Sequence, residues 1–322
     1  MPLNVLRPTP ITENGQLLSS TATESADTTW TVGASFALGA TVKYNHIRYE
    51  SLQAANVGHD PETINSTWWL ELGPTNHWAM FDTQTSTSTT KVGTLVVEIA
   101  PGTSINSVSV LGIGGCSSVT CEIFKGSGRT GADLIYSFTK SLDNTFISSW
   151  YQYFFEPYVV LTDLLFGSIV GATAAGVTGE GIAVPPYINC QVKLTFTATT
   201  GGTTVRVAGV LLGTTVELGE TQPGASAGIN DYSVKETDAY GVTTLVQRNF
   251  SKRASYTITV PNGQLRRVHS TLTALRATPC VWVASDDTNL SPLTVYGFYK
   301  DFSLLVQYID YSTFSLEIEG LT

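Results

Sequence analysis

Short apolar segments separated by turn residues fill the chain from Gly93 onward, and their spacing restricts the fold more than any other feature. GTLVVEIAPG, SINSVSVLGI, SSVTCEIFKG and QVKLTFTAT are rich in β-branched residues that alternate with polar ones, as in β-strands. Turn residues recur at intervals of roughly 8 to 12 residues, which is typical of a β-sandwich or jelly roll. The pattern predicts a mainly β chain with a jelly-roll sandwich built from residues 1–27 and 79–224.

The N-terminal segment LRPTPIT contains Pro8 and Pro10, which cannot donate a backbone hydrogen bond. We therefore expect it at the edge of a sheet or as a clamp along another domain. The first residues show no basic-then-apolar leader pattern. The longest uncharged apolar stretch, residues 164–178, is too short for a membrane span, so none is predicted.

Residues 28–78 differ from the rest because aromatic side chains are frequent and aliphatic bulk is scarce. The alternating segment from Val42 to Tyr49 predicts a β-hairpin that turns at Asn45-His46, and Trp68-Trp69 begins a third strand. A Gly-Val strand, a Tyr-containing strand, a Pro loop and closing Trp residues resemble the small chitin-binding-type carbohydrate modules. We therefore predict a three-stranded aromatic module inserted into the sandwich.

The resemblance implies a carbohydrate-binding surface on this module. Flat aromatic faces stack on the C–H faces of sugars, while nearby carboxylates and amides bond the hydroxyls. The candidate carbohydrate-binding residues are Tyr44, Tyr49, Glu50, Asp60, Asn65, Trp68, Trp69 and Trp78. The alternative is that several of these rings form the core of the module. Since neighbours in a strand point to opposite faces, we expect Trp68 inside and Trp69 outside.

Residues 225–322 predict an α+β domain with a single helix. A hairpin is expected around Tyr240-Gly241, and CVWVASDD, LTVYGFYKDFSLLVQYI and SLEIEGL are expected strands. The helix is predicted from Asn262 to Ala277, with Asn262 as its cap. Its apolar residues recur at helical spacing: Leu265, Val268, Leu272 and Leu275.

Composition argues against several other functions. The net charge of −9 disfavours a nucleic-acid partner. The cysteines, Cys116, Cys121, Cys190 and Cys280, do not have the spacing of a zinc site. Cys116 and Cys121 could pair across a bend, but free buried thiols are the preferred interpretation.

The remaining motifs predict no catalytic, cofactor or metal site. Residues 126–131 match G-x-G-x-x-G, but a strand follows where a dinucleotide site needs a helix, so we expect a hairpin loop. Asp286-Asp287 has the composition of a solvated turn. Asp231, Glu236 and Asp238 are acidic, but nothing in the sequence places them as a carboxylate pair about a cleft.

Five segments spread along nearly the whole chain form a recognisable combination: LRPTPIT, YESLQAANVGHDPETINSTWWLELGPTNHWAMFD, DYSVKET, NFSKRASY, and ATPCVWVASDD through SLEIEGL. Together they resemble a family of tailed-bacteriophage virion proteins from the tail tip and baseplate. The resemblance implies a non-enzymatic structural subunit, made in the host cytoplasm and located at the distal end of the virion tail. Its implied partners are further copies in a ring around the tail hub, other tail or baseplate subunits, and a host surface glycan.

Two other functions are compatible with the sequence. The first is a host-surface adhesin, which fails if Trp69 and Trp78 are both inaccessible. The second is a glycan-degrading enzyme, which requires two carboxylates facing each other across a cleft.

Overall fold

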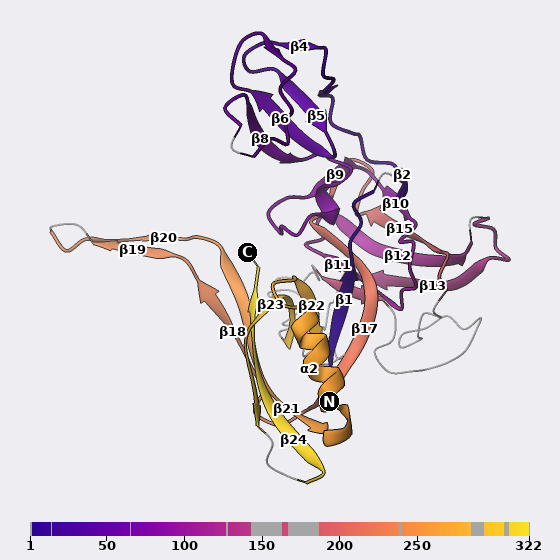
Figure 1. Ribbon diagram of the computed structural model, residues 1–322, viewed down its shortest axis with the longest axis vertical. Coiled ribbons are helices and arrows are strands. Elements are labelled where there is room, and N and C mark those ends of the chain that lie inside the picture. Colours follow the sequence, from indigo (N-terminus) through magenta and orange to yellow (C-terminus); the bar gives the residue numbers. More distant parts are fainter. Residues whose placement is uncertain are drawn as a thin grey trace, which may run out of the picture.

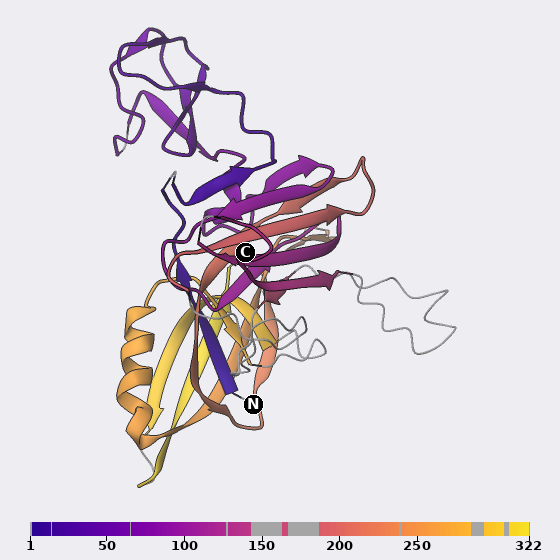
Figure 2. The ribbon, with the colours of Figure 1, turned by 90° about the vertical axis from the view of Figure 1, so that its right-hand side faces the viewer.

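The computed structural model describes residues 2–13, 15–64, 66–126, 128–142, 163–166, 187–237, 240–284, 293–305 and 309–321. Across these residues the protein is mainly β, with large antiparallel sheets and one α-helix, as predicted. The aromatic module lies at one end, a β-sandwich in the middle, and a helix-covered sheet at the other end (Figures 1 and 2). Residues 150–157 (WYQYFFEP), whose aromatic composition also predicts a strand, lie outside the described residues, as does the Asp286-Asp287 turn.

The sandwich combines a five-stranded antiparallel sheet with strands of a larger sheet. The five strands, in spatial order, are β13 (Leu134–Ser141), β12 (Cys116–Lys125), β15 (Cys190–Ala198), β10 (Leu95–Ile99) and β2 (Leu17–Ser20). Facing them are β14 (Leu164–Phe166), β11 (Ser107–Leu111) and part of β17 (Gly209–Thr221), beside the pair β9 (Thr89–Val92) and β16 (Thr204–Val207). Alternate residues from both layers, such as Val97, Phe196 and Leu212, share one dry core.

The larger sheet has nine strands, in the order β14-β11-β17-β1-β22-β23-β24-β21-β18. Its other members are β1 (Pro2–Thr9), β22 (Cys280–Val283), β23 (Thr294–Leu305), β24 (Tyr311–Gly320), β21 (Phe250–Pro261) and β18 (Ser226–Asp231). β17 contributes Leu212 to the sandwich core and Leu218 to a second core under the helix. The sheet therefore runs unbroken across the boundary predicted at residue 225.

The N-terminal strand lies in the interior of this sheet, so the expected edge position is wrong. β1 pairs with β17 along its whole length and with β22 at Asn4, Val5 and Leu6. Pro8 lies beyond the β22 pairing, where its missing N–H is not needed on that side. From the position of Pro8 onward, β1 pairs with β17 alone, so the proline is compatible with a strand inside the sheet.

The single helix is shorter than predicted and lacks the predicted cap. A 3-10 turn, η2 (Asn262–Gln264), leads into α2 (Leu265–Ala274), which packs Val268 and Leu272 on the second core. The Asn262 side chain instead donates to the Ile309 carbonyl and accepts a bond from Ser312 Oγ. It therefore anchors the start of β24 and does not cap the helix.

The four cysteines are free and buried, which confirms the preferred interpretation. Burial raises the pKa of the Cys116 thiol to about 11 and that of Cys280 to about 12. The G-x-G-x-x-G segment connects β12 to β13, as expected of a hairpin loop.

Candidate functional site

The aromatic module is built on a tight hairpin between β5 (Thr41–Tyr44) and β6 (Ile47–Ser51). Asn45 and His46 both adopt positive φ angles, 45° and 70°, as a two-residue type I′ turn requires. β8 (Trp69–Pro74) pairs with β6 as predicted, and the short β3 (Thr28–Thr29) adds a parallel fourth strand beside β5. β4 (Ser35–Phe36) and β7 (Asn56–Val57) form a separate small pair.

The module's core is aromatic, and the predicted orientation of its two adjacent tryptophans is wrong. Trp69 is 4% exposed and packs with Phe36, Val42 and Tyr49. Its indole N–H donates to the His59 carbonyl over 2.9 Å. Because β8 enters the sheet at Trp69, paired with buried Ser51, the strand alternation places Trp69 inside and Trp68 outside.

Two half-buried ring pairs remain on the surface of the module. Trp30 contacts Tyr44 edge to face, with an interplanar angle of 66°. Trp68 stacks on His59 with ring centroids 3.7 Å apart and an interplanar angle of 11°. An edge-to-face pair offers no continuous flat platform, and His59 covers one face of Trp68. These rings therefore form no continuous flat platform, and His59 leaves at most one face of Trp68 for stacking on a ligand.

The polar candidates lie at different places around the module. Asp60 accepts a bond from the Glu62 backbone N–H, and Glu62 in turn accepts a bond from Asn45 Nδ2. Glu50 is half-buried and pairs with Leu70 on the sheet. Burial, followed by nearby carboxylates, raises the pKa of Tyr49 to about 12. Asn65 lies outside the described residues.

Burial removes three of the predicted sugar-stacking rings. Tyr49 and Trp69 belong to the module core, and Trp78 belongs to the core of the sandwich. Since both Trp69 and Trp78 are inaccessible, the adhesin hypothesis loses the rings on which it depended. The prediction missed Trp30 and His59, although a lone Trp before the first strand and a His in the Pro loop were visible signals.

The hairpin turn connects the module to the sandwich. The His46 imidazole stacks on Trp78 with ring centroids 3.6 Å apart. The backbone carbonyl of His46 accepts a hydrogen bond from the Thr75 N–H. His77 bonds the Ala22 carbonyl through Nε2 and lies 3.2 Å from Glu24 through Nδ1. The module is therefore held by specific contacts as well as by the chain connections.

We predict that lowering the pH weakens this junction. Burial lowers the pKa of His46 below its usual value of 6.5, while a bond to the Thr12 backbone and the charge of Glu24 oppose that shift. The unfolded chain thus takes up the proton first, so stability is complete above about pH 6.5 and falls as the pH drops below it. Thermal unfolding of wild type and His46→Asn, from pH 8 to pH 5, checks this.

Asparagine is the matched control because it tolerates positive φ and does not titrate. We expect the melting temperature of the wild type to fall more steeply with acid than that of the variant. Equal slopes for the two proteins would show that His46 does not contribute to the acid sensitivity.

A two-stranded arm projects from the edge of the nine-stranded sheet (Figure 1). It consists of β19 (Val234–Thr237) and β20 (Thr243–Val246), joined around the predicted Tyr240-Gly241 turn. Its root and strands expose large apolar side chains, among them Ile229 at 57%, Leu245 at 75% and Phe250 at 55%. An isolated two-stranded hairpin is marginally stable in water, so packing against a further surface would stabilise this arm.

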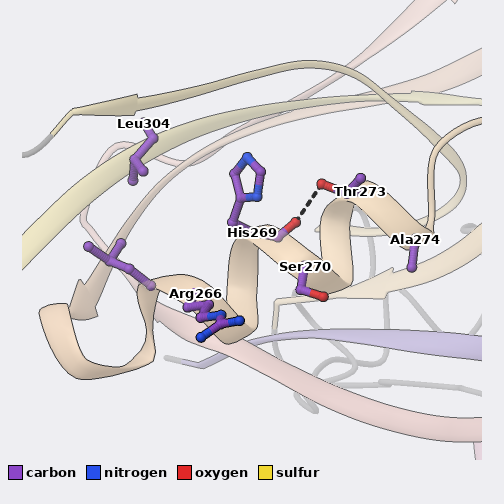
Figure 3. Close-up of a pocket in the computed structure, with 7 residues that line it drawn as sticks. Arg266, His269, Ser270, Thr273, Ala274 and Leu304 are labelled. Carbon is purple, nitrogen blue, oxygen red and sulfur yellow. Dashed lines mark hydrogen bonds between the residues drawn. The ribbon is translucent and has the colours of Figure 1, made fainter.

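An open groove of about 690 Å³ lies between α2 and the end of β23 (Figure 3). Leu265 and Ala274 from the helix and Leu304 from β23 give it an apolar lining, and Arg266 and His269 add basic groups. The Thr273 hydroxyl donates to the His269 carbonyl over 2.8 Å, which keeps that hydroxyl within the helix. Among the described residues that line this groove there is no carboxylate, so they do not supply the paired acids of a glycosidase.

The predicted acidic candidates lie elsewhere. Asp231 and Glu236 are exposed on or beside the arm, and Asp238 lies outside the described residues. Within the described ranges, no three His, Cys, Asp or Glu side chains are grouped as metal ligands. Among the same residues, no helix has the length and apolar character needed to cross a membrane.

Comparisons with known proteins add no family assignment. No protein-family model matches the chain, and no curated protein matches it. The proposals that follow therefore depend on surfaces and contacts of the chain itself, together with the resemblance of its segments to tail proteins.

Proposed function

We propose that this protein is a structural subunit of a bacteriophage tail tip or baseplate, which assembles with further copies into a symmetric ring around the tail hub. The exposed apolar arm is the observation that carries the proposal. Monomeric proteins rarely expose apolar surface in continuous patches, and larger patches mark interaction sites. Ile229 and Phe250 at the root and Leu245 on β20 are each more than half exposed, so contacts made through the arm and its root would cover apolar surface.

The arrangement of the three parts supports a role at the outer end of a particle. The module lies at the far end of the molecule from α2 and the lower part of the nine-stranded sheet (Figures 1 and 2). Contacts made through the sheet and arm would therefore leave the module projecting. The low content of charged residues, 13%, suits broad contact surfaces between subunits.

Antibody labelling of purified phage particles tests this proposal. We expect an antibody raised against the module to mark the distal end of the tail in electron micrographs. Labelling confined to the head, or absence of the protein from purified particles, would contradict the proposed function. A second antibody against a head protein of the same phage serves as the control for accessibility.

A further inference from the structure

We infer that the arm of one copy docks in the groove between α2 and β23 of the next copy, an inference that rests on the proposed ring assembly. The arm, defined by β19 and β20, is a protruding element with exposed apolar residues. The groove is a concave surface with an apolar lining on the same chain. Each copy therefore presents both halves of one contact.

The arm does not occupy the groove of its own chain. Figure 1 shows the arm extending away from the body, while α2 lies back along the lower part of the sheet. The two surfaces are thus well separated within one copy and can meet only between copies. A contact between two different surfaces of identical chains is heterologous, and such contacts close into rings when the rotation permits.

Charge distinguishes one face of the arm as the docking face. Val234 and Glu236 lie on the same face of β19, and their partners Val246 and Thr244 lie beside them on β20. This face combines apolar side chains with an exposed carboxylate. The opposite face carries Lys235 and its cross-strand partner Leu245, and it remains uncovered in this contact.

The groove complements that face. The segment from Asn262 to Ala277 contains three arginines, one histidine and no acidic residue, within a chain of net charge −9. Arg267 is already bonded to the Glu217 carbonyl and to Gln264, whereas Arg266 lies on the groove wall. Neither Arg266 nor Glu236 has an ion-pair partner within the described part of the chain. The geometry thus brings Glu236 of one copy to Arg266 of its neighbour.

Leu265 and Leu304 form an apolar strip on the receiving surface. Both side chains line the groove, and Leu304 is 37% exposed. Val246 of the arm, at 39% exposure, matches this apolar strip in chemistry. Burying these side chains together would supply the apolar part of the contact, and the charge pair would set its register.

Cysteine cross-linking in the full chain tests this contact. Thr244→Cys places a thiol on the docking face of the arm, and Ser270→Cys places one in the groove. The four native cysteines are buried, so the introduced thiols are the reactive ones. Mixing the two single variants under mild oxidation should give a cross-linked pair within minutes, and the double variant should give a ladder of linked copies.

Charge reversal provides the matched control. Glu236→Arg or Arg266→Glu alone should slow cross-linking at least about tenfold, which corresponds to about 1.4 kcal/mol. The two reversals together should restore the rate of the parent. A structural defect in either variant would not be repaired by the second change.

The outcomes separate this inference from the proposed function. Oligomers that form without any arm-to-groove cross-link would overturn the inference and leave ring assembly intact. Cross-linking that charge reversal does not slow would also overturn the assigned docking face. Protein that stays as single copies and never cross-links would overturn both.

Discussion

Replacing Trp69 by alanine is expected to unfold the aromatic module at a cost of about 3 to 5 kcal/mol, the usual range for a buried tryptophan. The ring fills the centre of the module against Phe36, Val42 and Tyr49, and its N–H holds the loop at His59. A module this small cannot close over the resulting cavity. Hydrogen exchange measured by mass spectrometry should show the amides of β5 and β6 losing their protection, while β10 and β15 stay protected.

The adjacent residue provides the control. Trp68→Ala removes a half-exposed ring that stacks on His59, so we expect a loss of less than about 1.5 kcal/mol and unchanged protection in β5 and β6. Equal loss of protection in both variants would contradict the assignment of Trp69 as the core residue. Loss in Trp68→Ala alone would restore the orientation expected from the sequence.

Removing the arm is expected to abolish self-association. Residues 234–246 can be replaced by Asn-Gly, because Val234 and Val246 face each other at the base of the arm and the chain ends next to them are therefore close together. The shortened chain should keep its sandwich and helix, since no arm residue belongs to either core. Light scattering should find the wild type as an assembly and the variant as a single copy, with the dissociation constant raised at least about 100-fold.

Val92→Ser is the matched control for this change. Val92 is 64% exposed, comparable to Leu245, but lies on β9 of the sandwich. We expect its loss to leave the assembly state unchanged. An arm-deleted protein that still assembles like the wild type would show that the arm is not the main contact.

Local sequence patterns predicted the elements of this fold well. The Asn45-His46 turn, the Tyr240-Gly241 hairpin and the helix at Leu265 all follow from short-range rules about turn residues and apolar spacing. The mainly β class followed in the same way from the spacing of strands. These features depend on residues close together in the chain.

Features that depend on distant contacts were harder to predict. Pro8 suggested an edge strand, but only the position of β22 determines which N–H groups need partners. The alternation of side chains along a strand predicts that Trp68 and Trp69 point to opposite faces, but it does not predict which face is buried. That depends on Phe36 and Val42, which pack on Trp69 from other parts of the module. Trp78 looked like a module residue in sequence, yet the fold buries it in the sandwich.

The predicted carbohydrate-binding site differs most from the structure, because it depends on which rings are buried. Aromatic residues occur both in protein cores and on sugar-binding surfaces. Only the burial of each ring distinguishes the two roles, and burial cannot be determined from the sequence. The arm was predicted as a hairpin, but its proposed role in assembly was not, because the exposure of Leu245 and the groove beside α2 cannot be inferred from the sequence. The pairing that we propose between Glu236 of one copy and Arg266 of the next could not be predicted from the sequence of one chain, where the two residues lie 30 positions apart.

Native mass spectrometry of the purified full-length chain tests the central claim most directly. If copies of this chain join through the arm, the spectrum should contain a closed multimer with one dominant copy number, and that species should vanish on arm deletion. A spectrum of single copies alone, across the micromolar range and at low salt, would contradict the account.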